Sequence, residues 1–232
     1  HNSLFLIAHF HNVIIGGVVF GSFAGMTFWF PKAFGYKLDP FWGKMSFWFW
    51  FLGYWFAFTP LYVLGLMGVT RRMSHFDDPS LQPWFIVAAF GALLIAVGIA
   101  SFIVNLVVSY RRREQLRDVS GDPWDGRTLE WSTSSPPPAY NFAFTPVVHD
   151  IDAWWDMKQH GYTRPTSGFQ PIHMPRYTAA GVVLAGISTV FGFAMIWHIW
   201  WLAGLSFVAL VGSAIYHTFN YDRDYNIPAE DV

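Results

Sequence analysis

Long stretches without a charged side chain constrain this chain more than any other feature. Hydrocarbon about 30 Å thick needs roughly 20 apolar residues of helix to cross it. The stretches Leu4–Phe30, Met45–Thr70, Trp84–Tyr110 and Tyr177–Tyr221 carry no Asp, Glu, Lys or Arg. At about 1.5 Å per residue the last is too long for one span, so we expect it to turn near Trp200–Gly204. The pattern predicts an all-α integral membrane fold with about five transmembrane helices of a larger bundle.

Composition supports this class and excludes others. Charged residues make up 12% of the chain, against about a quarter in soluble domains. The net charge of -1 gives no electrostatic reason to expect a nucleic-acid partner. Cysteine is absent, which excludes disulfides and thiolate metal sites. The chain opens at His1 within an apolar context, so we expect it to be a fragment of a longer polypeptide.

The stretches divide the chain into four parts. Residues 1–110 hold three predicted transmembrane helices, and residues 177–221 hold two more. Between them, 111–176 is a polar, proline-rich segment, which we interpret as a cytoplasmic loop with little regular structure. Residues 222–232 form a cytoplasmic tail. All of the 14 Lys and Arg residues except Arg71 and Arg72 fall on one side of this arrangement. The positive-inside rule places that side in the cytoplasm and the His1 end of the first helix toward the periplasm.

Two histidines on the first span are the strongest candidate for a functional site. His9 and His11 flank Phe10 in an uncharged helix, where polar side chains are costly and usually functional. An i, i+2 pair points about 200° apart on a helix, so the two cannot share one metal ion. Each could instead hold its own haem, because neutral imidazole is a good axial ligand. The alternative is two core histidines, each hydrogen-bonded to a neighbouring helix.

Arg71 and Arg72 are predicted to lie on the opposite side of the membrane from all the other Lys and Arg residues, and they directly follow the second predicted helix. One interpretation is interfacial snorkelling, helped by Asp77 and Asp78. The other is a clamp for the two propionates of a haem, since guanidinium binds carboxylate bidentately. We expect His9 and His11 to lie two to three turns below the outer end of the first helix. A haem held edge-on there would bring its propionates up to the arginines.

In combination, these motifs resemble the C-terminal part of subunit I of the haem-copper terminal oxidases. The motifs, in chain order, are His1-Asn2, Ala8-His9-Phe10-His11, Arg71-Arg72, Thr128-Leu129-Glu130-Trp131 and Ser135-Pro136-Pro137-Pro138. The cytochrome bo-type ubiquinol oxidase branch is the most similar. The resemblance implies that His9 ligates the iron of the high-spin haem O and is the catalytic residue of this chain. It implies His11 as a ligand of the low-spin haem B, Arg71 and Arg72 as partners of propionates, mainly those of haem B, and His1 near the propionates of the high-spin haem.

The resemblance also implies a function for the whole protein. On this resemblance we expect a proton-pumping ubiquinol oxidase of the bacterial inner membrane, which would reduce oxygen to water at a haem-copper centre and have subunits II, III and IV as partners. The copper ligands would lie upstream, and the fragment would not be active alone. Asn2 stands where the cytochrome c branch has Asp and a magnesium site.

Three alternatives stay open. The first is a haem-copper cytochrome c oxidase. The second is a dihaem cytochrome b, which would need His pairs about 13 residues apart that this span lacks. The third is a cofactor-free transporter in which His9 and His11 relay protons.

Overall fold

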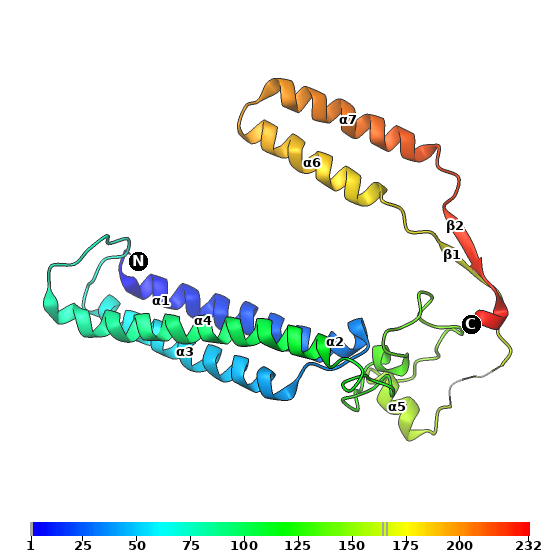
Figure 1. Ribbon diagram of the computed structural model, residues 1–232, viewed down its shortest axis with the longest axis horizontal. Coiled ribbons are helices and arrows are strands. Elements are labelled where there is room, and N and C mark those ends of the chain that lie inside the picture. Colours follow the sequence, from blue (N-terminus) through cyan, green and yellow to red (C-terminus); the bar gives the residue numbers. More distant parts are fainter. Residues whose placement is uncertain (1, 164, 166) are drawn as a thin grey trace. The chain divides into compact units, whose positions relative to one another are not determined.

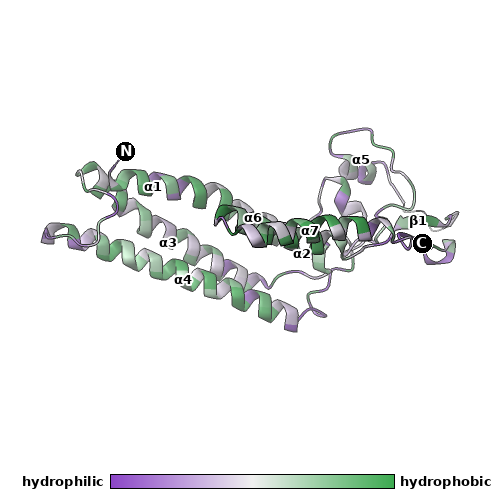
Figure 2. Ribbon diagram, turned by 90° about the horizontal axis from the view of Figure 1, so that it is seen from above, coloured by the Kyte–Doolittle hydropathy of each residue, from purple (hydrophilic) through white to green (hydrophobic). Residues whose placement is uncertain are grey.

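A computed structural model describes residues 2–163, 165 and 167–232. The chain forms two compact units, each described here by itself. Unit 1 contains His1–Asn141 and Val147–Tyr162, and unit 2 contains Phe142–Pro146 and Thr163–Val232. Long helices dominate both units (Figure 1), and hydrophobic residues run along them (Figure 2). This confirms the prediction of an all-α membrane fold. Among the described residues, four helices are long and apolar enough to cross a membrane.

The first membrane helix is continuous from Leu4 to Phe34. It consists of α1 (Leu4–Val13), a π-helical stretch (Ile14–Val19) and α2 (Phe20–Phe34). The Ser3 side chain caps its start by accepting the Phe5 N–H. The uncharged stretch Leu4–Phe30 is followed by Pro31, which we interpreted from the sequence as the end of this helix, and that was wrong. Proline lacks an N–H, but its carbonyl still accepts the N–H of Gly35 at 2.7 Å, and the helix continues beyond it. Gly35, at φ 80°, ends the helix instead.

The second and third membrane helices are α3 (Pro40–Leu66) and α4 (Gln82–Arg111), which is preceded by a short 3-10 turn (Pro79–Leu81). They pack as antiparallel neighbours through small residues. A Cβ added to Gly91 would come within 2.1 Å of the Ala57 backbone N, so the two backbones touch there. The helix α3 begins five residues before the predicted Met45, because Asp39 caps it by accepting the N–H groups of Phe41 and Trp42.

The start of α1 is tied to the segment that follows α3. Leu4 N donates to Val69 O at 2.9 Å, and Ser3 and Thr70 form an antiparallel bridge. Leu4 also packs with Leu64 and Leu81 in a small buried core. Together these contacts hold the first helix against α3 at the end that carries both histidines.

The polar segment of unit 1 after α4 is more ordered than predicted. It contains a 3-10 turn (Leu129–Ser132) and α5 (Ala153–Gln159). The buried Lys32, in the last turn of α2, anchors it: the ammonium donates to the carbonyls of Gly121, Thr133 and Ser134 at 2.8, 2.9 and 3.2 Å. The ammonium also lies 5.3 Å from the ring centre of the buried Trp131.

A second anchor of this segment is Asp122. Burial alone would raise the pKa of this carboxyl group. Hydrogen bonds from Gly126 N, Trp154 and Lys158, together with the positive charge of Lys158, outweigh burial and lower the pKa below its usual value. The carboxylate therefore stays ionised and joins α5 to the loop before it.

Unit 2 is a helical hairpin on a two-stranded ribbon. The helices are α6 (Ala180–Ile196) and α7 (Trp200–Thr218). The strands β1 (Ile172–Pro175) and β2 (Asp224–Ile227) pair antiparallel, and a 3-10 turn (Ala229–Asp231) follows β2. We predicted the helical turn at Trp200–Gly204. It lies at residues 197–199 instead, where His198 takes a φ of 56°. With 17 residues, α6 is apolar but shorter than the four membrane helices.

Candidate functional site

The two histidines lie on opposite flanks of the face that α1 presents to α3. Ala8 is fully buried and marks the middle of that face. At about 100° per residue, His9 lies roughly 100° to one side of Ala8 and His11 about 60° to the other. The flanks are therefore separated by the contact with α3 on one side and by the exposed Phe10 on the other. No metal ion can bind both rings at once.

The His11 ring is held on several sides. Its Nδ1 lies 2.8 Å from the backbone carbonyl of Ile7, which can only accept, so Nδ1 carries the proton and donates. The Phe58 ring of α3 stacks on the imidazole, with centres 4.7 Å apart and planes 13° from parallel. Phe10 meets it edge-on. The other ring nitrogen, Nε2, is left with a free lone pair.

Aromatic residues of α3 fix the neighbouring backbone. Tyr62 OH accepts a hydrogen bond from Asn12 Nδ2 at 3.0 Å, and Tyr54 OH donates to the Asn12 carbonyl at 3.3 Å. Tyr54, Phe58 and Tyr62 are spaced by four residues, so all three face α1. These three positions were not predicted from the sequence, although their spacing on one helix was a detectable signal.

His9 has a different environment. It is exposed, and within the described residues its ring makes neither a hydrogen bond nor an aromatic contact. In an apolar membrane helix such a side chain needs a partner from outside this chain. Its imidazole is therefore available to a ligand.

The arginine pair lies at the same end of the first helix. Arg71 N donates to Asn2 O at 3.0 Å, and Arg71 Nη2 lies 3.4 Å from Asn2 Oδ1. The helix begins at Leu4, so His9 and His11 lie about one and a half and two turns below its end. That is nearer to the arginines than predicted.

The arginine charges have no carboxylate partner within the part of the chain that the structure describes. The interaction of Asp77 and Asp78 with the arginines, which the snorkelling interpretation expected, is not found among the described residues. Asp78 instead accepts the Ser80 N–H at 2.9 Å, and its hydrogen bonds with Ser80 lower its pKa. Arg72 is exposed and adopts φ 64°, a strained backbone conformation for a side chain of this type.

His1 and a multi-residue metal site remain to be considered. His1 lies outside the described residues. Among those that are described, no group of three or more His, Asp or Glu side chains could hold a metal ion. Each candidate histidine would thus supply a single ligand to an iron whose other ligands come from elsewhere.

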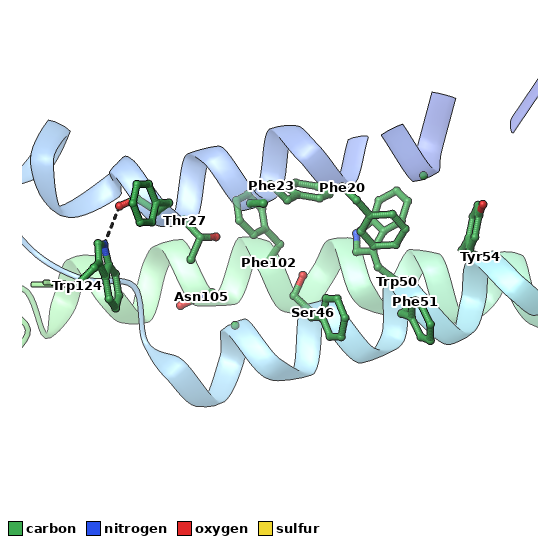
Figure 3. A pocket seen from close by; sticks show the side chains of 15 residues that line it. Phe20, Phe23, Thr27, Ser46, Trp50, Phe51, Tyr54, Phe102, Asn105 and Trp124 are labelled. Carbon is green, nitrogen blue, oxygen red and sulfur yellow. Dashed lines mark hydrogen bonds between the residues drawn. The ribbon is translucent and has the colours of Figure 1, made fainter. Parts of the chain in front are cut away.

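A cavity of about 730 Å³ begins one turn beyond the histidines. Its walls are mainly aromatic (Figure 3), with Phe20 and Phe23 from α2, Trp50 from α3 and Phe102 from α4. The Trp50 indole nitrogen is buried and has no hydrogen-bond partner. The cavity can take an apolar group, but Tyr54 is the one ionisable side chain in its described lining. It therefore offers no acid–base pair for catalysis.

Comparison with known proteins gives consistent results. Residues 1–94 match the family described as cytochrome c and quinol oxidase polypeptide I. The chain is 54% identical to ubiquinol oxidase subunit 1 of Acetobacter aceti and 49% identical to cytochrome bo(3) ubiquinol oxidase subunit 1 of Buchnera aphidicola. It is 50% identical to a probable cytochrome c oxidase subunit 1 of Bradyrhizobium diazoefficiens. Each comparison covers 100% of this chain and 35–36% of the relative. The chain thus spans about a third of the length of these curated relatives.

Proposed function

We propose that this chain, which belongs to the subunit I family of the haem-copper cytochrome c and quinol oxidases, holds two haems on opposite flanks of its first membrane helix. The family implies haem and copper as cofactors. In our proposal His9 ligates the iron of the high-spin haem, haem O, where oxygen is reduced. His11 ligates the low-spin haem B. The observation that carries the proposal is the placement of the two imidazoles on opposite flanks of α1.

The chemistry of His11 fits an iron ligand. Histidines that bind metal usually donate their second ring N–H to a carbonyl or carboxylate, which fixes the tautomer and the ring orientation. The Nδ1–H bond to the Ile7 carbonyl is of that kind. It leaves Nε2 as the coordinating atom and makes the imidazole more basic.

The arginine pair fits the propionates. Arg71 and Arg72 lie near the start of α1, which is about 8 Å above His9 at 1.5 Å per residue. Within the described residues neither pairs with a carboxylate, so both guanidinium groups can donate hydrogen bonds to one. We propose that they bind the propionates, mainly those of haem B, and that His1 lies near those of haem O.

These roles lead to a function for the complete protein. When bound, the haems supply one-electron chemistry, and copper would be held by residues outside this chain. We propose a ubiquinol oxidase of a bacterial inner membrane that reduces oxygen to water and translocates protons, together with other oxidase subunits. The charge distribution favours residues 111–176 and 222–232 on the cytoplasmic side. The relatives named as ubiquinol oxidases support quinol as the donor.

A second donor is also supported, because one relative of 50% identity is named a probable cytochrome c oxidase. Oxygen uptake by the purified complex separates the two. We expect uptake with ubiquinol and none with reduced cytochrome c. The reverse result would make cytochrome c the donor.

Substitution of each histidine in the complete complex tests the haem assignment. We expect His11→Ala to lose the low-spin absorbance. His9→Ala should retain that signal but lose carbon monoxide binding and oxygen reduction. His75→Ala, in the exposed loop, is the control and should match the unsubstituted complex. Identical spectra for the His9 and His11 variants would refute the assignment.

A further inference from the structure

We infer that Phe58 is a positioning residue that fixes the plane of the His11 imidazole and so sets the electronic state of the iron bound there. The inference rests on the proposed haem at His11. Phe58 touches neither quinol nor oxygen in this proposal. It would act only through the ligand.

The His11 ring has two side-chain torsions, and two separate contacts restrain it. The hydrogen bond to Ile7 O fixes the position of Nδ1. The outer torsion of histidine is intrinsically broad, so a second contact is needed to define the plane of the ring. Phe58 supplies it, because the stacked geometry, 4.7 Å apart and 13° from parallel, is lost when the imidazole rotates.

Phe58 is itself held in place. The Tyr54 ring lies one helical turn away, with its centre 6.1 Å from that of Phe58. Tyr54 and Tyr62, one helical turn before and one after Phe58, both form hydrogen bonds with Asn12. These bonds fix the rotation of α1 relative to α3. The stacked pair of His11 and Phe58 therefore lies between two hydrogen bonds that restrain the rotation of both helices.

The two ligands on this helix are therefore not equivalent. The His11 ring is oriented by Phe58 of α3 and by its hydrogen bond to the Ile7 carbonyl. His9, two residues earlier, has no ring contact or hydrogen bond within the described residues. A rigid ligand suits an iron that only transfers electrons, because little has to move when its charge changes. A less restrained ligand suits the site where oxygen is bound and reduced.

With iron bound at Nε2, the plane of the His11 imidazole would determine how its orbitals overlap with those of the iron. A change in that plane alters the g values of a low-spin ferric haem, and changes near the ligand also shift its potential. These signals report ring orientation directly. A role for Phe58 in packing alone would leave them unchanged as long as the haem stays bound.

The test uses the purified complete oxidase complex. Phe58→Leu removes the flat ring but keeps an apolar side chain, whereas Phe58→Tyr keeps the ring. Phe56→Leu is a matched control on the same helix, because Phe56 contacts Phe90 of α4. Haem content, the electron paramagnetic resonance spectrum and the midpoint potential of the low-spin centre are measured for each variant.

We expect Phe58→Leu to shift the g values and the potential with full haem content, and Phe58→Tyr and Phe56→Leu to match the unsubstituted complex. Loss of the low-spin haem in Phe58→Leu would assign Phe58 to retention of the haem and would overturn the inference. Unchanged g values and potential in Phe58→Leu overturn it, as does equal haem loss in Phe56→Leu. Retention of the low-spin signal in His11→Ala would instead overturn the proposed haem ligand itself.

Discussion

Gly65→Ala tests whether the histidine helix depends on its close approach to α3. A Cβ at this position would lie 2.1 Å from the backbone N of Phe5, whereas ordinary contact begins at 3.4 Å. The helices must therefore separate by about 1.3 Å there. The obstacle is backbone rather than a flexible side chain, so it cannot turn aside. The site is about two turns from the His11–Phe58 stack.

Such a displacement should affect function more than stability. A shift of about 1 Å in a reacting group can cost on the order of 100-fold in rate. We expect Gly65→Ala to lower quinol-driven oxygen uptake by about 10- to 100-fold and to shift the low-spin haem spectrum. The assay is oxygen uptake by complexes matched for haem content, with optical spectra of the same samples.

Gly21→Ala is the matched control, because nothing lies within 4 Å of a Cβ added there. It should retain the activity and the spectrum of the unsubstituted complex. If Gly65→Ala also retained both, the packing of α1 on α3 would not position the histidines, and our reasoning from this contact would be wrong.

Three further predictions concern the elements that support the site. Lys32→Met removes the donor of three carbonyls, those of Gly121, Thr133 and Ser134, and should destabilise the loop by about 2–4 kcal/mol. The measurement is the rate of proteolysis of the loop, which should increase. Lys44→Met, at an exposed position, is the control and should leave that rate unchanged. Asn12→Leu removes the bond to Tyr62 and should cost about 1 kcal/mol, measured as a lower thermal midpoint; an unchanged midpoint would contradict it. The lowered pKa of Asp122 means that its contribution to loop stability is present above the unfolded value of about 3.9 and lost as pH falls through the folded value. Proteolysis of the loop should therefore accelerate only below about pH 4, and equal rates at pH 3 and pH 7 would refute this.

The sequence predicted those parts of the fold that depend on hydrophobic length. The uncharged stretches located all the long helices, because a membrane admits few other structures. Their ends were less accurate, since they depend on single residues. Asp39 starts α3 early through its cap, and Gly35 rather than Pro31 ends α2.

The sequence named His9 and His11 as candidate site residues, but it did not predict their surroundings. Helix geometry placed His9 and His11 on opposite sides without any structure. The stack of Phe58 on His11 depends on how α3 packs against α1, and that packing is set by Gly65 and the Leu4 core. Such contacts join residues about 50 positions apart, so local patterns do not reveal them.

A density map of the complete oxidase complex tests the central claim most directly. Our account predicts one porphyrin coordinated by Nε2 of His11, with propionates toward Arg71, and a second coordinated by His9 on the opposite flank of α1. A map in which either imidazole points to protein, or in which both haems lie on one side of the helix, would contradict it.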